Sequence, residues 1–352
     1  MEPSFKIGNR TIGRDYPPLV IAEIGINHGG SLDVAIAMAD SALVAGAEVV
    51  KHQTHICEDE MSEEARLEIP DHTPENVYET IHRCSLSESD ERALQQHVMS
   101  KGSIFISTPF SRAALLRLET FNVPAYKIGS GECNNYPLVE LIAQTGKPII
   151  LSTGMNTIDT IKPSVEIFRK YGNPFAILHC TNVYPTPPSL VRLDALTVLQ
   201  NEFPDAVVGL SDHTTTNYTC FGAVSLGASI LEKHFTDDKN RDGPDIPCSI
   251  DGPQLSDLIL GSNIIHTARG EYKGPVEEEA SIISFAFASV VATRPISSGE
   301  AFTKDNIWVK RPGSGDFSAE DYESLLGQFA ARAIGPGKQI QRSDVVARDG
   351  SK

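Results

Sequence analysis

The chain has 352 residues, of which 40% are hydrophobic, enough for one large domain with an appendage or for two domains. Its formal net charge of −16 disfavours nucleic acid and anionic lipid as partners, because no broad basic surface would attract phosphate groups. Six cysteines are scattered without a C-x-x-C pair, which is typical of reduced, buried thiols. The first residues lack a basic and apolar signal region, and no apolar run approaches ~18 residues. We therefore expect a cytoplasmic protein without a membrane segment.

Apolar runs rich in strand-forming residues recur along the first 240 residues, and segments with helical periodicity follow them, including 31–47, 87–102, 111–121, 157–172 and 253–270. Eight such runs occur: PLVIAEIGIN, AEVVKHQT, GSIFISTPF, PAYKIGSGE, KPIILSTG, PFAILHCTNVYP, AVVGLSDHT and SILEKHFT. Eight continuously apolar strands alternating with helices predict a (β/α)₈ TIM barrel, buried on both faces of the sheet. A doubly wound open sheet is the alternative. No G-x-G-x-x-G or G-x-x-x-x-G-K-[ST] motif follows any run, which counts against its nucleotide-binding members.

The composition changes after Gly270. Residues 271–284 are polar and acidic and are typical of a linker, whereas 285–352 hold short β-like runs broken by Gly and Pro. We therefore predict a barrel domain over 1–270, a linker over 271–284 and a small, mostly β domain over 285–352. A core this thin indicates that the small domain leans on another part of the protein.

Polar residues stand where the apolar runs end. In a TIM barrel these positions line the active site at the C-terminal ends of the strands. They are Glu23, Asn27, Lys51, Gln53, Thr108, Lys127, Ser130, Glu132, Ser152, Asn182, Tyr184, Ser211, His213 and His234. Packing alone does not require lysines, carboxylates, hydroxyls and amides to converge on one rim, so the set indicates a functional site.

Two lysines on this rim indicate an anion site. Lys51 and Lys127 can hold a phosphate and a carboxylate through charge-assisted hydrogen bonds. Polar groups that would support them belong to Thr108, Ser130, Ser152, Asn182 and Ser211. The predicted ligand carries more than one negative charge. Either lysine could instead serve as the Schiff-base amine of a class I aldolase.

His213 and His234 end what should be neighbouring strands, roughly 5 Å apart. Both imidazoles can then reach one divalent metal ion at about 2 Å, with coordination positions left open for substrate. A hydrogen-bonded pair without metal is the alternative for two such histidines, and the phosphate-type rim favours the metal.

The other histidines receive different interpretations. His52 and His55 lie close to the carboxylates of 58–60, but strand alternation points His52 away from Lys51 and favours a structural role. His28 either supports the site or caps its loop. His179 is expected in the core, and loops or helix surfaces are expected for His72, His82, His97 and His266.

Ordered motifs from about Phe5 to Val346 resemble the sialic acid synthase family, most closely the bacterial N-acetylneuraminate synthases. The barrel motifs are EIGINHGG, VVKHQTH, FISTPFS, YKIGSGE, LSTGM, LHCTNVYPTP, GLSDHT and ILEKHFT. In the tail, VKRPGSG and GDFS resemble the antifreeze-like SAF domain of that family. One departure is His52, where many relatives have an aromatic residue.

The resemblance implies condensation of phosphoenolpyruvate with open-chain N-acetylmannosamine to give N-acetylneuraminate, with phosphate released by C–O cleavage. It implies a divalent metal, typically Mn²⁺, with Mg²⁺ or Co²⁺ as alternatives, bound by His213 and His234. Implied phosphoenolpyruvate contacts are Lys51, Thr108, Lys127, Ser130, Ser152, Asn182, Tyr184 and Ser211, and implied sugar-site residues are Gln53, Glu132, Asp245 and either Phe285 or Phe287. Glu23 and Glu132 are the candidate acid and base, and the sequence does not assign which is which.

Arg311 of the tail carries a rigid charged fork that can hold sugar oxygens over a barrel mouth. The resemblance favours the mouth of a partner's barrel in a domain-swapped homodimer. Alternatives for the activity are legionaminic or pseudaminic acid synthesis with a related acceptor sugar, the Schiff-base aldolase, and a non-enzymatic carbohydrate-binding protein built around the tail.

Overall fold

The computed structural model describes residues 2–68, 75–270 and 272–346. His72, predicted in a loop, lies outside the described residues, as do the last six residues of the predicted small domain. The chain divides into two compact units, Met1–Gly270 and Glu271–Lys352.

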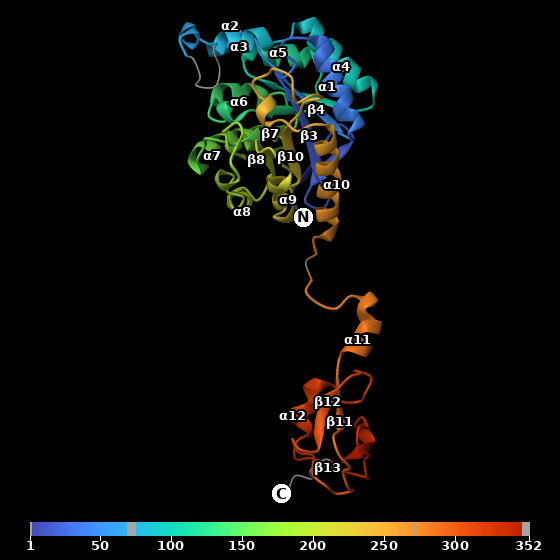
Figure 1. Cartoon of the computed structure of the whole chain (residues 1–352). Helices are drawn as coiled ribbons and strands as arrows, with labels where there is room; N and C mark the ends of the chain where they lie inside the picture. The colour runs from blue at the N-terminus through green and yellow to red at the C-terminus, as the bar shows by residue number, and fades with distance from the viewer. Residues whose placement is uncertain (1, 69–74, 271, 347–352) are drawn as a thin grey trace. The chain divides into compact units, whose positions relative to one another are not determined.

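The first unit contains a closed barrel of parallel strands surrounded by helices (Figure 1). Every predicted apolar run contains one of the eight strands, and the closed order β10-β3-β4-β5-β6-β7-β8-β9 confirms the TIM barrel and excludes the open sheet. The strands are β3 (Leu19–Gly25), β4 (Val49–Thr54), β5 (Ile104–Pro109), β6 (Tyr126–Ile128), β7 (Ile149–Ser152), β8 (Phe175–Cys180), β9 (Val207–Asp212) and β10 (Ile230–His234).

Helices follow the strands, and their ends carry the expected capping residues. The side chain of Ser31 accepts the Val34 N–H at the start of α1, and Gly172 ends α7 with φ +71°. The helices outside the barrel are α1 (Leu32–Val44), α4 (Glu88–Ser100), α5 (Arg112–Phe121), α6 (Tyr136–Ala143), α7 (Ile158–Tyr171), α8 (Ala195–Glu202), α9 (Tyr218–Ser225) and α10 (Gly252–Ala268). Two short helices, α2 (Cys57–Glu60) and α3 (Val77–Cys84), lie in the connection between β4 and α4.

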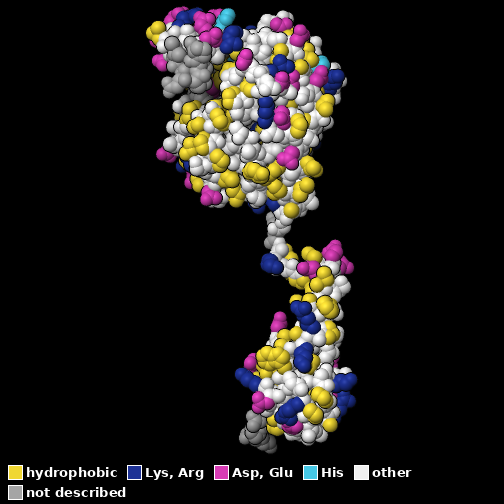
Figure 2. Space-filling model, in the orientation of Figure 1, with side chains coloured by type: hydrophobic (Ala, Val, Ile, Leu, Met, Phe, Trp, Pro, Cys, Tyr) yellow, Lys and Arg dark blue, Asp and Glu magenta, His cyan; other side chains and the backbone are white. Residues whose placement is uncertain are grey.

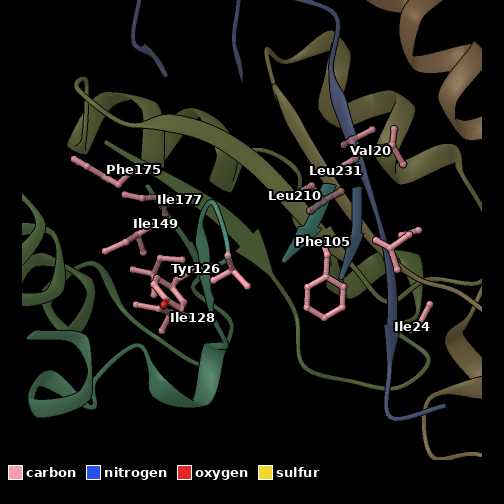
Figure 3. Packing of buried hydrophobic residues seen from close by; sticks show 14 of the residues in the cluster. Val20, Ile24, Phe105, Tyr126, Ile128, Ile149, Phe175, Ile177, Leu210 and Leu231 are labelled. Atoms are coloured by element: carbon pink, nitrogen blue, oxygen red, sulfur yellow. The ribbon is translucent and has the colours of Figure 1, made fainter. Parts of the chain in front are cut away.

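Side-chain alternation along the strands separates two apolar layers. Outward-facing residues such as Val20, Phe105 and Leu231 pack beneath the helices (Figure 3). Inward-facing residues of the first strand halves fill the barrel, and the hairpin of β1 (Ser4–Ile7) and β2 (Arg10–Gly13) adds Phe5, Ile7 and Ile12 to this inner cluster. The barrel is therefore filled at the N-terminal ends of its strands, and the opposite ends remain for a site.

The second unit is small and mostly β, as predicted. Its antiparallel pairs are β11 (Ser289–Ala292) with β12 (Ile307–Lys310) and β13 (Phe329–Ala330) with β14 (Val345–Val346), beside the short helix α12 (Tyr322–Leu325). Val290, Phe302 and Ile340 belong to its separate core.

The predicted linker is not fully extended. Residues Glu277–Glu279 form a 3-10 turn and Ala280–Ala286 form helix α11. A helix advances only about 1.5 Å per residue instead of up to ~3.3 Å, so 272–284 reaches less far than an extended segment would. Glu279 Oε2 accepts the Val276 N–H at 2.9 Å and so caps the start of this turn, which the polar composition alone did not reveal.

On the face drawn in Figure 2, acidic and basic side chains are intermixed over the barrel unit. Among the described residues, the structure contains no helix with the length and apolarity needed to cross a membrane. All six cysteines are buried and none forms a disulfide within the described part of the chain, in line with the expectation of reduced thiols.

Candidate active site

The side chains that point into the barrel change from apolar to polar or charged between one inward-facing position and the next along each strand. The apolar residues Ile21, Val49, Ile106, Ala125, Ile150 and Ile230 belong to the inner cluster. Two positions later on the same strands stand Glu23, Lys51, Thr108, Lys127, Ser152 and Glu232, all buried. Charged groups in such a position require partners from the protein or from a ligand.

The first buried ion pair joins β3 and β4. Lys51 Nζ lies 2.8 Å from Glu23 Oε2 and donates a 3.0 Å hydrogen bond to Thr108 Oγ1. Gln53 Nε2 donates to Glu23 Oε1 at 2.7 Å. Glu23 Oε2 has Lys51 as its ion-pair partner and receives no further hydrogen bond from the described residues. That oxygen can still accept a hydrogen bond from a ligand or a water.

The second ion pair joins β6 and β10 more loosely. Lys127 Nζ lies 3.4 Å from Glu232 Oε1, which also accepts a 3.3 Å hydrogen bond from Ser211 Oγ. Burial lowers the pKa of Lys127, and Glu232 offsets part of that effect. Burial alone would raise the pKa of Glu232, but Lys127 and Lys51 together lower it. Glu232 Oε2 has no hydrogen-bond partner within the described ranges.

Sequence reasoning missed Glu232. The signal was present, because Glu232 lies two residues before His234 and must share its inward face. The prediction considered only the residues at which apolar runs end, and Glu232 lies inside a run.

A cradle of small polar groups adjoins the lysines. Gly154 N donates a 3.0 Å hydrogen bond to Ser130 Oγ. A Cβ at Gly154 would come within 1.9 Å of Asn182 Oδ1 and 3.0 Å of Ser130 Oγ, so a side chain here would displace the Asn182 amide. Ser152 Oγ is buried and has no partner in the described part of the chain. Hydroxyl and amide groups with spare capacity beside two lysines suit an anionic ligand.

The two histidines of the predicted metal site lie together, with ring centroids 5.3 Å apart. His213 Nδ1 donates to Thr181 O at 2.9 Å, which leaves its Nε2 with a free lone pair. His234 Nδ1 is buried without a hydrogen-bond partner among the described residues, and Asp245 Oδ2 lies 3.5 Å from it. Tyr184 stacks on His213 at 4.1 Å. Burial, reinforced by His234, lowers the pKa of His213 to about 4, so its imidazole is neutral as a ligand must be.

These side chains fit a metal ion with open coordination positions. Within the described residues, no group of three or more His, Cys, Asp or Glu side chains is arranged to hold a metal ion. The two imidazoles could therefore hold a metal only with positions left to substrate and water, unlike a closed structural zinc site.

The polar group on β3 and β4 meets the histidine pair at Gly25, which has φ +51°. A Cβ on Gly25 would lie 3.2 Å from Gln53 Nε2, 3.2 Å from Glu23 Oε1 and 3.5 Å from Asp245 Oδ2. These three groups therefore converge on one point at the barrel mouth.

Glu132 stands at the rim in the 3-10 turn Ser130–Glu132 and is partly buried. Burial, reinforced by the nearby carboxylate of Glu60, raises the pKa of Glu132 to about 7. Glu132 can therefore both give and take a proton near neutral pH.

The tail residues predicted to join the site lie in the second unit. Phe285 and Phe287 are 68% and 60% exposed, and Arg311 is exposed as well. Their part in the site stays a prediction.

His52, expected to be structural, and His28, left open between supporting the site and capping its loop, lie side by side. His52 Nδ1 is 3.1 Å from Glu91 Oε1 of α4, and its ring stacks near Phe105, so it points away from Lys51. His28 Nδ1 accepts the Gly30 N–H and caps the loop after β3. Both rings are buried and their Nε2 atoms lie 3.2 Å apart.

Comparison with known proteins shows the family of the chain. The NeuB family matches residues 38–274, and the SAF domain matches residues 287–346. The chain is 34% identical to the N,N'-diacetyllegionaminic acid synthase of Campylobacter jejuni, over 89% of this chain and 96% of that protein. It is also 34% identical to the N-acetylneuraminate-9-phosphate synthase of Homo sapiens, over 91% of this chain and 90% of that protein.

Among solved structures, the N-acetylneuraminic acid synthetase of Leptospira borgpetersenii in complex with citrate is similar with a TM-score of 0.73 and 30% identity, covering 80% of this chain and 96% of that chain. The family match spans most of the barrel unit and the SAF match most of the second unit. The chain belongs to the NeuB family and is an enzyme of the sialic acid synthase type with a C-terminal SAF domain.

Proposed function

We propose that this enzyme is an N-acetylneuraminate synthase, which condenses phosphoenolpyruvate with N-acetylmannosamine and releases phosphate. The observation that carries the proposal is the set of two buried lysine–glutamate pairs beside the Ser130–Gly154–Asn182 cradle. Phosphoenolpyruvate carries both a carboxylate and a phosphate, which suits two lysines with hydroxyl and amide donors around them. An aldehyde sugar would be bound between these groups and the Gln53–Asp245 side of the mouth.

In this proposal the lysines and the polar cradle position the enol phosphate. Lys51 and Lys127 neutralise its charge, with further contacts from Thr108, Ser130, Ser152, Asn182, Tyr184 and Ser211. The chemical logic is that C3 of the enol attacks the aldehyde carbon, which leaves positive charge at C2. The buried carboxylates of Glu23 and Glu232 would stabilise that charge electrostatically. Water then adds at C2, and the C2–O bond to phosphate breaks.

His213 and His234 would hold a divalent metal, with Mn²⁺ the first candidate and Mg²⁺ or Co²⁺ the alternatives. Bound there, the metal would supply Lewis-acid polarisation of the aldehyde oxygen. The neutral His213 ring and the unpartnered Nδ1 of His234 support this assignment.

Glu132 is the proposed acid–base group, because its raised pKa of about 7 lets it exchange a proton near neutral pH. Glu23 instead remains the partner of Lys51 and Gln53. Gln53, Glu132 and Asp245, with Phe285 or Phe287, would line the sugar site.

We also propose a domain-swapped homodimer in which Arg311 of one subunit reaches the sugar in the other's barrel. Mixing inactive Arg311→Ala subunits with inactive His234→Ala subunits tests this. A heterodimer then holds one complete site and regains activity. If Arg311→Ala alone is impaired and the heterodimers form but stay inactive, Arg311 does not act in the barrel of the other subunit.

The acceptor is tested with a panel of sugars. Purified enzyme with phosphoenolpyruvate and Mn²⁺ is offered N-acetylmannosamine, its 6-phosphate and the 2,4-diacetamido acceptors of legionaminic and pseudaminic acid synthases. We expect phosphate release and a nine-carbon product with N-acetylmannosamine. A preference for a diacetamido sugar would favour the second candidate, a legionaminic acid synthase, which the similarity to the Campylobacter jejuni enzyme supports.

The purified enzyme also allows a test of the alternative that it is a Schiff-base aldolase. A buried lysine with a lowered pKa, such as Lys127, is the form that attacks carbonyl groups. Borohydride trapping with pyruvate would label it in a Schiff-base enzyme, and we expect no labelling.

A further inference from the structure

His55 and Glu60 form a buried pair at the barrel mouth that the proposed chemistry leaves without a role. His55 lies two residues after Gln53, and Glu60 is the last residue of α2. Their side chains are only 3% and 13% exposed. The His55 ring stacks on Phe110, with centroids 4.2 Å apart and ring planes 16° apart. Stacking and burial fix the direction in which the two ring nitrogens point.

The pair continues directly into the site. His55 Nδ1 lies 2.9 Å from Glu60 Oε2, and its Nε2 lies 3.1 Å from Gln53 Oε1. Gln53 Nε2 donates to Glu23 Oε1 at 2.7 Å. An unbroken row of contacts therefore runs from Glu60 through the imidazole and the amide to the carboxylate paired with Lys51.

The order of donors and acceptors along this row follows from its two ends. Glu23 is the partner of Lys51, so its carboxylate accepts and the amide must turn its NH₂ group toward it. The amide oxygen then faces His55, whose Nε2 must carry a proton. Glu60 is also a carboxylate acceptor, so Nδ1 must carry a proton as well. A neutral imidazole has one N–H and satisfies only one of its two neighbours.

We propose that the His55–Glu60 pair is a positioning element that holds a doubly protonated imidazole and thereby locks the Gln53 amide, with its NH₂ group toward Glu23 and the acceptor sugar. This rests on the proposed function only for the identity of the ligand that Gln53 meets. When the ring loses a proton and donates to Glu60, the amide either loses its partner or turns its oxygen toward the Glu23 carboxylate.

Charged groups around the ring decide how firmly it holds both protons. Glu60 on α2 contacts it directly, and Glu132 acts on Glu60 from the turn after β6. Glu23 of β3 acts through Gln53, and His28 in the loop after β3 opposes a second positive charge. Lys51 faces the other end of the row through its ion pair with Glu23.

Three variants separate positioning from packing. His55→Phe keeps the stack on Phe110 but removes both donors. Glu60→Gln lets a neutral ring accept a hydrogen bond from the introduced amide and still donate to Gln53, so the lock survives. The exposed His82→Phe is a matched control that also replaces an imidazole by a phenyl ring.

We expect His55→Phe to lower kcat/KM for the acceptor sugar by about 10²-fold, the scale of a misplaced contact group, with KM for phosphoenolpyruvate within about threefold of wild type. Glu60→Gln should stay within about fivefold and should lose the alkaline decline that deprotonation of His55 gives the wild type. Equal losses for both substrates, or no loss in His55→Phe, would overturn the proposal.

Nitrogen NMR of the free enzyme gives a readout that needs no substrate. Both ring nitrogens of His55 should be protonated at the pH of greatest activity in the wild type, and only Nε2 in Glu60→Gln. A neutral ring in the wild type would refute the inference directly. If no acceptor is turned over at all, the proposed function fails, while the NMR result still judges the state of the pair.

Discussion

Buried polar side chains on the inner and outer faces of the barrel strands differ in how completely they are hydrogen-bonded. Lys51 and Glu232 point into the barrel, and the next residues, His52 and Lys233, point outward beneath the helices. All four are buried, yet the inner groups keep unused hydrogen-bonding capacity and the outer ones do not. Exposure alone therefore does not separate a functional polar residue from a structural one.

The outer networks are saturated. Glu91 accepts from Thr54 and faces His52 on one oxygen, and its other oxygen lies 3.3 Å from Arg117. Lys233 donates to Asp212 and also to the carbonyl oxygen of Thr216 at 2.9 Å. Such closed networks hold strand to helix and leave nothing for a ligand.

The inner groups are incomplete on one side. Glu232 Oε2, Ser152 Oγ and His234 Nδ1 are all buried without hydrogen-bond partners among the described residues. Leaving such groups unsatisfied costs about 1–3 kcal/mol each, which a bound substrate can recover. Buried neutral atoms such as Thr80 Oγ1 and Ser262 Oγ also lack partners, but the carboxylate and imidazole atoms that lack them in the described part of the chain lie on the inner face.

Loss of the histidine pair should have the largest effect. Chelation should abolish phosphate release and Mn²⁺ should restore it, because the imidazoles are the proposed metal ligands. His234→Ala should be inactive with an unchanged circular dichroism spectrum. Full activity in a rigorously metal-free sample would rule out the metal.

Replacing one lysine on each face should have different effects. The inner replacement should mainly lower activity, and the outer one should mainly lower stability. Lys127→Met should lower kcat/KM for phosphoenolpyruvate by about 10²–10³-fold, because it removes a charge that is proposed to contact the substrate. Lys233→Met leaves Asp212 buried and unpaired, and should lower the free energy of unfolding by about 3–5 kcal/mol. Lys127→Met should cost less stability, because Lys127 pairs with Glu232 only loosely at 3.4 Å, and Lys51 still acts on Glu232. Urea unfolding and steady-state kinetics on both variants provide the measurement. Similar stability losses from the two variants would erase the distinction between the faces.

A single methyl group should disturb the cradle. Gly154→Ala places a Cβ against Asn182 and Ser130, so KM for phosphoenolpyruvate should rise by about 10²-fold. Gly131→Ala is the matched control at the same rim, because nothing lies within 4 Å of its added Cβ. Equal KM values for the two variants would show that the cradle does not contact the substrate.

The smallest expected effect is on stability through Glu132. Its folded pKa of about 7 lies above its usual value of 4.5, so the folded state binds the extra proton between these two values. Wild-type stability therefore falls as pH rises through that window and is level above it. Glu132→Gln should be more stable than wild type by about 1–3 kcal/mol at pH 8 and by little at pH 4.5. Thermal unfolding at both pH values checks the sign.

Sequence periodicity predicted the barrel and most of its rim, because a parallel strand buried on both faces is recognisable and its last inward residue meets the mouth. Glu232 was missed since it lies one alternation below that end. The β1–β2 hairpin that fills the barrel floor and the helix in 277–286 depend on local packing and capping. The His55–Glu60 contact requires α2 to fold back over the strand end, which no short-range pattern records.

Isotope labelling tests the central claim, a condensation with C–O cleavage in this site. The reaction is run with phosphoenolpyruvate and the accepted sugar in ¹⁸O water, and the released phosphate is examined by mass spectrometry. Because water adds at C2 in the proposed chemistry, the phosphate should contain no label and the label should enter the C2 position of the nine-carbon product. Phosphate that carries ¹⁸O would mean that water attacks phosphorus, and would contradict the account.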